Sequence, residues 1–292
     1  MNQIDRAFRN AKLLPICDAS RIVLFSDCHR GYGGWSDSFA VNATAYFAAL
    51  RHYDRNGFTY IELGDGDELW ENRRFSEISA AHCDVFRVLA KLNSDGRLIM
   101  LYGNHDIDKR RRLRLMDRYY DTTETVSHPL FPAMPVHESL LLHHISGYDI
   151  FLLHGHQADF FNSRLWLLSR FLVRYIWKPL QIVGMKAPAA REFSSNRRLK
   201  TERRLADWAI ENHTLTVAGH THRPRLPAPD EGLYCNDGSC VHPRCITAIE
   251  ISSGAISLVS WSTKTRPDGN LYIGRDILAG PHRIANYYKA AR

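Results

Sequence analysis

The sequence is short of cysteine, and it has no internal repeat and no low-complexity tract. Its six cysteines are spread over 292 residues, which excludes the small secreted domains that disulfides hold together. The first twelve residues contain Asp5 and no apolar core, so they do not resemble a signal peptide. We therefore expect a protein of the reducing cytoplasm.

The composition is otherwise that of an ordinary folded protein. Hydrophobic residues make up 45% of the chain and charged residues 24%, which excludes disorder, collagen and coiled coil as its main structure. The length suits one large domain or two small ones. A formal net charge of +7 indicates a negatively charged partner, such as phosphate, nucleic acid or an anionic membrane.

Short apolar runs alternate with helical patterns in the first half of the chain. Strands are predicted at 21–25, 59–63 and 97–102, and helices at 39–53 and 75–92. This order predicts parallel strands covered by helices.

The second half contains mainly strand patterns. Strands are predicted at 139–143, 148–153, 214–218, 245–251 and 255–261. The last two form a hairpin across a Ser-Ser-Gly turn, so an antiparallel layer is expected beside the parallel one. Residues 275–292 are expected to form a surface arm.

A basic segment at 158–213 separates two of these strands. It has eleven Lys and Arg against five Asp and Glu, so it carries six of the seven net positive charges, and it holds three of the six tryptophans. Arg170, Arg174 and Lys178 share one helical face, and the charges argue against a membrane span. Two interpretations stay open: an amphipathic helix on a lipid or active-site surface, or a packed helix with solvated arginines.

Five short motifs follow predicted strands, at the position where α/β proteins build their sites. They are Asp27-Cys28-His29, Gly64-Asp65, Gly103-Asn104-His105-Asp106, His154-Gly155-His156 and Gly219-His220-Thr221-His222. Imidazole, carboxylate and amide oxygen donors suit zinc, iron and manganese. The neighbouring glycines let the backbone turn sharply beside the ions.

In this order, D-x-H, GD, GNHD, HGH and GHTH resemble the calcineurin-like metallophosphoesterases over about residues 21–261. The resemblance implies an α/β fold, a two-sheet β-sandwich flanked by helices, in a single domain 1–292 with a helical lid insertion at 158–213. It also implies two divalent metal ions, with manganese favoured over iron, zinc or cobalt. The implied ligands of the first metal are Asp27, His29, Asp65 and His222, and those of the second are Asp65, Asn104, His154 and His220.

The same resemblance implies hydrolysis of a phosphoester by a metal-bridging hydroxide that attacks phosphorus in line. His105 is then placed to protonate the leaving group, and Asp106 to fix the tautomer of His105. The alternative for this pair is a purely structural role. His154 is preferred to His156 as the ligand because it directly follows its strand.

The basic insertion resembles the lid of UDP-2,3-diacylglucosamine pyrophosphohydrolases, which cleave a lipid-linked diphosphate. This implies Arg191, Asn196 and Lys200 as substrate-binding residues, with peripheral membrane contact through the lid. Two departures stand against that substrate: His105 replaces an arginine that is common in those enzymes, and Gly66-Asp67-Glu68 follows Asp65 where an apolar residue is usual. A histidine there fits a general phosphatase or phosphodiesterase better.

Other interpretations remain open. The basic charge permits a nuclease, although no DNA-binding module is present and no specific nucleic acid is predicted. A metal-free protein-binding scaffold is the third class, against which the complete ligand set argues. Cys235, Cys240, His242 and Cys245 form either a zinc site of unusual spacing or a set of small hydrophobic and polar residues.

Overall fold

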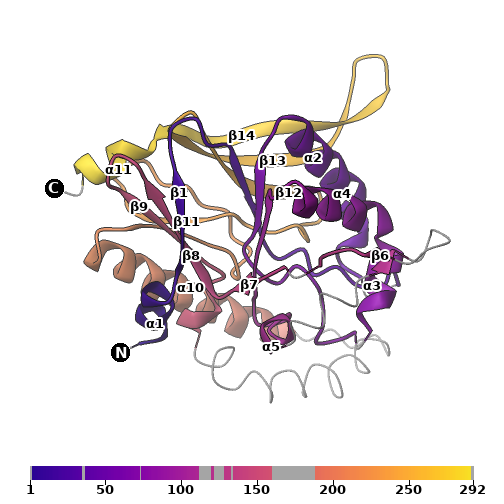
Figure 1. Cartoon of the computed structure of the whole chain (residues 1–292), viewed down its shortest axis with the longest axis horizontal. Coiled ribbons are helices and arrows are strands. Elements are labelled where there is room, and N and C mark those ends of the chain that lie inside the picture. The colour runs from indigo at the N-terminus through magenta and orange to yellow at the C-terminus, as the bar shows by residue number, and fades with distance from the viewer. Residues whose placement is uncertain are drawn as a thin grey trace.

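The computed structural model describes residues 2–34, 37–72, 74–111, 120–121, 128–132, 134–159 and 188–290. Two β-sheets occupy the centre of the molecule, and helices flank them on both sides (Figure 1). This is the two-sheet α/β architecture with flanking helices that the sequence predicts.

The larger sheet has seven strands in the order β14-β13-β12-β2-β3-β4-β7. Its strands are β2 (Ile22–Phe25), β3 (Thr59–Glu62), β4 (Leu98–Leu101), β7 (Val136–His137), β12 (Ile246–Ser252), β13 (Ala255–Thr265) and β14 (Leu271–Arg283). β2, β3 and β4 are mutually parallel, whereas β12 is antiparallel to β2 and forms a hairpin with β13. Both the predicted parallel layer and the predicted hairpin are therefore present.

The smaller sheet has five strands in the order β1-β8-β9-β10-β11. They are β1 (Lys12–Ile16), β8 (Ser139–His144), β9 (Asp149–Leu153), β10 (Leu215–Ala218) and β11 (Tyr234–Asn236). β8 and β9 form an antiparallel hairpin, and β9, β10 and β11 run parallel.

Helices cover both sheets (Figure 1). They are α1 (Gln3–Arg9), α2 (Ala43–Arg55), α3 (Phe75–Ala81), α4 (Cys83–Ser94), α5 (Asp108–Arg111), α10 (Pro188–Glu211) and α11 (Ile284–Ala290), with short 3-10 turns at Ala40–Asn42 and His156–Ala158 and a small ribbon of β5 (Tyr120–Asp121) and β6 (His128–Pro129). The buried residues of α2 recur at helical spacing and include Tyr46, Ala49, Leu50 and Tyr53. None of the helices in these described ranges is long and apolar enough to cross a membrane.

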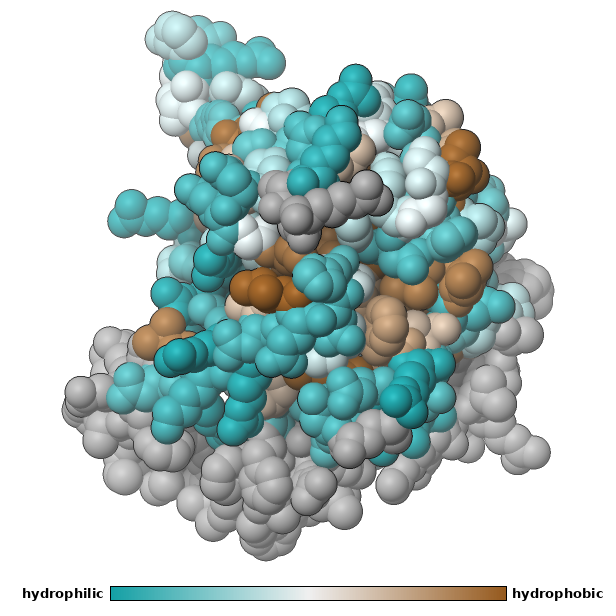
Figure 2. Space-filling view, turned by 90° about the vertical axis from the view of Figure 1, so that its left-hand side faces the viewer, coloured by the Kyte–Doolittle hydropathy of each residue, from teal (hydrophilic) through white to brown (hydrophobic). Residues whose placement is uncertain are grey.

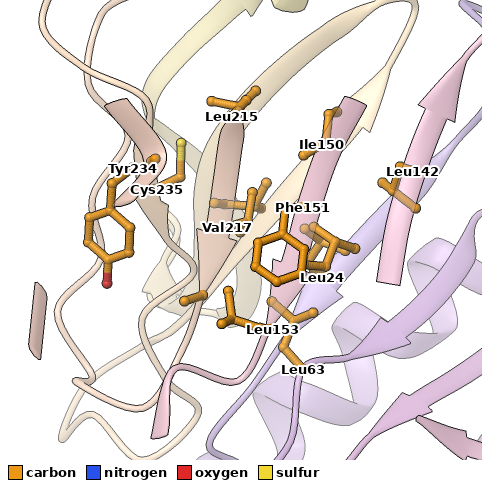
Figure 3. Packing of buried hydrophobic residues seen from close by; sticks show 14 of the residues in the cluster. Leu24, Leu63, Leu142, Ile150, Phe151, Leu153, Leu215, Val217, Tyr234 and Cys235 are labelled. Carbon is orange, nitrogen blue, oxygen red and sulfur yellow. The ribbon is translucent and has the colours of Figure 1, made fainter. Parts of the chain in front are cut away.

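Alternate residues of β2 enter two different apolar cores. Val23 and Phe25 pack with α2, α3 and α4, whereas Ile22 and Leu24 pack with the smaller sheet and with α1, α10 and α11. Figure 3 shows part of the second core, with side chains from both sheets. A strand buried on both faces needs a continuous apolar run, which is what 22–25 provides.

Two predictions from the sequence were wrong. The helix expected at 75–92 is two helices, because the backbone at His82 leaves the helical region (φ −122°, ψ 38°). Residues 275–292 are no surface arm within their described part: β14 pairs with β13 along the sheet, and Tyr287 of α11 is fully buried. Ile277 and Leu278 of this segment are exposed, so strand pairing and a few buried anchors hold it rather than a buried apolar run.

The topology brings the motif residues to one region. β2, β3 and β4 run parallel in one sheet and β9 and β10 run parallel in the other. All five motifs lie directly after the carboxyl ends of these strands. Parallel strands end at one edge of their sheet, so each sheet delivers its motif residues together.

Candidate metal centre

Six of the seven residues expected as metal ligands form contiguous groups. Ligand atoms of Asp27, His29 and His222 lie within 4.8 Å of one another, as do those of Asp65, His154 and His220. His29 and Asp65 also share a group with His105, which joins the two sets. Asn104, the seventh, lines a pocket together with His29, Asp65, His105, His220 and His222.

Left-handed backbone is concentrated at these residues. The φ angles are 50° at Asp27, 48° at His29, 51° at Asp65, 68° at His220 and 58° at His222, and only two other non-glycine residues of the described ranges share this conformation. Such a conformation costs a residue with a Cβ about 1–3 kcal/mol. Strain of this kind persists where the surrounding structure imposes it, typically at a functional site.

Two motif glycines are required by close approach. A Cβ on Gly103 would lie 2.1 Å from Asp65 Oδ1, and one on Gly219 would lie 2.2 Å from Ser26 Oγ and 2.6 Å from Asp27 Oδ2. Glycine is therefore needed at both positions, because a Cβ would overlap with these side chains.

Hydrogen bonds select the tautomers of two histidines. Nδ1 of His154 lies 2.8 Å from the carbonyl oxygen of Leu63, which can only accept, so this nitrogen carries the proton. Nδ1 of His29 lies 2.9 Å from Oε2 of Glu68 and is assigned the same way. In the neutral rings, Nε2 is then left with its lone pair, as a metal ligand requires.

Buried polar atoms without hydrogen bonds lie at the same place. They are Oδ1 of Asp27, Nε2 of His29, Oδ1 of Asn104 and Nε2 of His154. Nε2 of His154 is 3.1 Å from Oδ2 of Asp65 and Nε2 of His222 is 3.0 Å from Oδ1 of Asp27. Unsatisfied buried acceptors are costly, and lone pairs that converge in this way fit divalent cations.

The electrostatics of the cluster also fit cation binding. Burial raises the pKa of Asp65, but the neighbouring His154 and His105 outweigh it and hold this pKa well below its usual range. Burial lowers the pKa of His154, but the charges of Asp65 and Asp27 outweigh this effect and raise the pKa to about 9. These carboxylates are therefore ionised, and they draw positive charge to this point.

The contacts of His105 and Asp106 differ from the expected ones. In the described structure Asp106 makes no hydrogen bond to His105: it accepts from the backbone N–H groups of Gly103, Asp65 and Gly66 at 2.7, 3.2 and 3.1 Å. Asp106 thus fixes the loops rather than a histidine tautomer, because its carboxylate faces into the turn.

Glu68 holds His105 instead, and sequence reasoning missed this role. Nδ1 of His105 is 2.9 Å from Oε1 of Glu68, and the ring stacks on Trp70 at 4.1 Å between centroids. Burial lowers the pKa of His105, but Glu68 and Asp65 outweigh it, so the net shift is upward. The signal was present in the sequence as an acidic residue three positions after Asp65.

A second group of carboxylates is neutralised by a lysine side chain. Glu62, Asp67 and Asp106 are close enough to hold a metal ion, but Nζ of Lys109 lies 3.4, 2.7 and 2.8 Å from them. Arg30 adds ion pairs to Glu62 and Asp67, both at 2.8 Å. Lys109, on α5, is buried, so it is a structural cation rather than a solvated one.

Helix α10 forms one wall of the pocket through Arg197, Arg198 and Thr201. Arg197 donates to Oδ1 of Asp159, whose Oδ2 is 3.5 Å from Nε2 of His220. The pocket has a volume of about 350 Å³. The face of the molecule that carries α1, α10 and α11 is largely hydrophilic (Figure 2).

The three expected substrate-binding residues are not among those that line this pocket. Asn196 and Lys200 are exposed on α10, and only the backbone of Arg191 is described. The helix periodicity directs the neighbouring positions 197, 198 and 201 inward instead. Arg170, Arg174 and Lys178, the expected basic face, lie outside the described residues.

Two further expectations concern residues near the site. His156 is buried but belongs to neither ligand group of the described structure, whereas His154 does. Cys235, Cys240, His242 and Cys245 form no metal-binding group within the described ranges, and Cys235 and Cys240 are fully buried. Cys235 and Cys240 therefore behave as buried small residues, whereas His242 is exposed and Cys245 is half-buried.

Known proteins resemble the chain in sequence and fold. The curated UDP-2,3-diacylglucosamine hydrolase of Ralstonia nicotianae is 26% identical over 247 residues, which are 76% of this chain and 84% of that protein. Solved structures include Vps29 of Chaetomium thermophilum (TM-score 0.40, 10% identity, 89% of this chain and 96% of that one) and a cold-active protein-tyrosine phosphatase of a psychrophilic Shewanella (0.41, 13%, 92% and 83%). TM-scores below 0.5 support no inference from either structure.

The family comparison covers most of the chain. The model of the family described as calcineurin-like phosphoesterase matches residues 20–224, a range that includes β2, β3, β4, β9 and β10 and every one of the five motifs. On this match the chain belongs to the calcineurin-like phosphoesterase family.

Proposed function

We propose that this phosphoester hydrolase uses two divalent metal ions. Asp27, His29, Asp65 and His222 would hold the first, and Asp65, Asn104, His154 and His220 the second. The observation that carries the proposal is a set of buried polar atoms that have no hydrogen bond in the described structure, on Asp27, His29, Asn104 and His154, at the same place as the two ligand groups. Bound there, the ions would supply Lewis acidity and a water of lowered pKa as the nucleophile. Manganese is the favoured metal.

The protein side chains would supply the remaining chemistry. His105 lines the pocket and is not needed as a ligand, so it is placed to give a proton to the leaving group. Glu68 would keep that proton in place, because its carboxylate favours the charged imidazolium. Trp70 stacks on the ring and fixes its plane.

The proposed substrate class is a phosphoester or diphosphate with a second anionic group. The name of the Ralstonia relative supports a lipid-linked nucleotide diphosphate. Arg198 is exposed at the pocket wall, and in the described structure no ion pair or hydrogen bond engages its guanidinium. It is therefore available to an anion, in a way that Arg197 is not. Arg191, Asn196 and Lys200 and peripheral membrane contact through the lid remain part of the proposal.

A metal-reconstituted activity screen tests this function. The Mn²⁺-loaded protein would be assayed on nitrophenyl phosphate, bis-nitrophenyl phosphate and a UDP-linked diacyl sugar, with its metal content measured in parallel. The proposal expects about two ions per chain and hydrolysis of at least one ester. A protein that binds no divalent metal would overturn it. The Asp65→Ala variant is the control for contaminating phosphatase.

A further inference from the structure

The hydroxyl of Ser26 lies between two carboxyl groups. Its Oγ is 2.5 Å from Oδ2 of Asp27 and 2.7 Å from Oδ1 of Asp237. Asp27 and Asp237 follow strands of different sheets, β2 and β11, and all three side chains belong to residues that are essentially fully buried. The contact therefore crosses from one sheet to the other behind the ligand groups.

A count of hydrogen atoms shows that one of the two carboxyl groups beside Ser26 is protonated. A serine hydroxyl has one hydrogen and can donate it to only one of the two carboxyl groups. If both were ionised, one of the two short oxygen–oxygen contacts would have no hydrogen in it. One carboxyl group must therefore be protonated and donate to Ser26.

The surroundings decide which carboxyl group holds the proton. Both oxygens of Asp27 lie beside nitrogens: the backbone N–H of His220 is 2.7 Å from Oδ2, and Nε2 of His222 is 3.0 Å from Oδ1. Oδ2 of Asp237, in contrast, is buried and has no hydrogen bond in the described structure, so a negative charge on this carboxyl group would be left uncompensated. The Asp237 carboxyl is thus the neutral one, and the serine donates to Asp27.

The two oxygens of Asp27 then have different environments. Oδ2 accepts from Ser26 and also from the backbone N–H of His220 at 2.7 Å. Oδ1 is buried and accepts no hydrogen bond from the residues that the structure describes. Two donors on one oxygen fix the rotation of the carboxylate and leave the other oxygen directed at His29 and His222, 3.6 and 3.0 Å away.

We propose that Asp237 is a positioning residue: as a neutral acid it donates to Ser26, Ser26 donates to Asp27, and this chain holds Oδ1 of Asp27 toward the first metal site. The inference rests on the proposed function for its metal. Asp237 is not itself a ligand, since it belongs to no metal-binding group of the described structure. Removal of such outer partners typically costs 10–100-fold in metal affinity.

Three single variants and one control variant test this series of hydrogen bonds, and a double variant of two of them completes the set. Mn²⁺ alone is the probe. Asp237→Asn keeps a neutral donor for Ser26, whereas Asp237→Ala removes it and Ser26→Ala breaks the chain in the middle. Ser239→Ala is the matched control, because its hydroxyl is also buried nearby but has no hydrogen bond. Calorimetric titration of each metal-stripped, full-length protein gives the dissociation constant, and thermal unfolding in chelator reports folding.

The expected result is near wild-type affinity for Asp237→Asn and Ser239→Ala, and 10–100-fold weaker binding for Asp237→Ala and Ser26→Ala. The Ser26→Ala/Asp237→Ala double variant should be no weaker than Ser26→Ala, because Asp237 acts through the serine. Wild-type affinity in Asp237→Ala would overturn the proposal. A folded Asp237→Asn variant that binds Mn²⁺ ten times more weakly than wild type would also overturn it. This second measurement keeps the test decisive if the alanine variants do not fold.

An infrared measurement separates this proposal from the proposed function. At neutral pH the wild type should show the carbonyl stretch of a buried protonated carboxyl group, and Asp237→Asn should lack it. Absence of that band in wild type overturns the proton assignment, whatever metal is bound. Absence of Mn²⁺ binding by wild type with the band present would refute the metal centre instead.

Discussion

Glu68 and His105 are joined by a hydrogen bond of 2.9 Å between Oε1 and Nδ1. The same carboxylate reaches Nδ1 of His29 with its other oxygen, also at 2.9 Å. One acidic side chain therefore orients both the proposed acid and a proposed metal ligand. A residue shared in this way should affect both rate and metal affinity when it is changed.

Glu68→Gln should lower the turnover and shift its pH profile. The carboxylate raises the pKa of His105, so its loss should lower that pKa. An acid group must be protonated to act, so activity should be lost on the alkaline side at a lower pH than in wild type. The measurement is kcat against pH with excess Mn²⁺. An unchanged alkaline limb would show that His105 does not titrate in the rate.

His105→Ala should reduce the rate while the metals stay bound. A general acid typically contributes 10²–10⁴-fold, and the loss should be smaller for nitrophenolate, which leaves without a proton. The check compares kcat for an alkyl and a nitrophenyl ester, with metal content measured in both proteins. Equal losses on the two esters would mean that His105 acts on the phosphoryl group rather than on the leaving group.

The residues of the site could be predicted from the sequence, but the side-chain contacts around them could not. Strand ends followed by Asp, Asn and His are local patterns, and the two sheets bring these residues together as expected. The partner of His105 was not predictable by adjacency, because Asp106 turns inward to three backbone N–H groups while Glu68 arrives from the neighbouring loop. Such contacts depend on side-chain direction, which a motif does not encode.

The structure of the two ends of the chain could not be predicted from the sequence either. β1 and α1 were not predicted, and β14 was predicted as an arm. Most side chains of β1 and β14 are exposed or half-buried, so neither strand is marked by a buried apolar run. β1 pairs with β8, which lies far away in the sequence, and β14 forms a hairpin with β13. Pairing with a neighbouring strand overrides local propensity in such edge strands.

Asp65→Ala should lose more metal than Asn104→Ala. Asp65 contacts the side chains of both groups, with Oδ2 3.9 Å from Nε2 of His29 and 3.1 Å from Nε2 of His154. Its removal takes a ligand from both proposed ions, whereas Asn104 serves one. Elemental analysis after Mn²⁺ loading and gel filtration measures the difference. Equal retention in the two variants would argue against a shared ligand.

Mn²⁺ affinity should rise with pH between about 7 and 9. The pKa of His154 in the metal-free protein is about 9, so below that value the metal has to displace a proton. Each displaced proton changes the affinity by about tenfold per pH unit until the pKa is passed. Titrations in two buffers of different ionisation enthalpy count the protons released. A pH-independent affinity would mean that His154 is not a ligand.

The same shift predicts how stability in chelator depends on pH. The pKa of folded His154 is raised above the unfolded value of about 6.5. Its contribution to stability is therefore complete below about pH 6.5 and is lost as the pH rises through about 9. Unfolding temperatures of wild type and His154→Gln should converge toward alkaline pH if this histidine is the source.

Arg198→Ala should discriminate substrates by their second anionic group. Arg198 is at the pocket wall, and its guanidinium has no partner in the described structure, while Arg197 beside it is held by Asp159. A hydrogen bond to a charged group contributes about 1.5–3 kcal/mol, which is about 10–100-fold in KM for a diphosphate. The KM for nitrophenyl phosphate, which has no second anionic group, should change far less. Arg203→Ala is the matched control, because Arg203 lies on the same helix, exposed and 4.0 Å from Asp207. A loss of the same size on both substrates would place Arg198 on the scissile phosphate, and no loss on either would remove it from the substrate site.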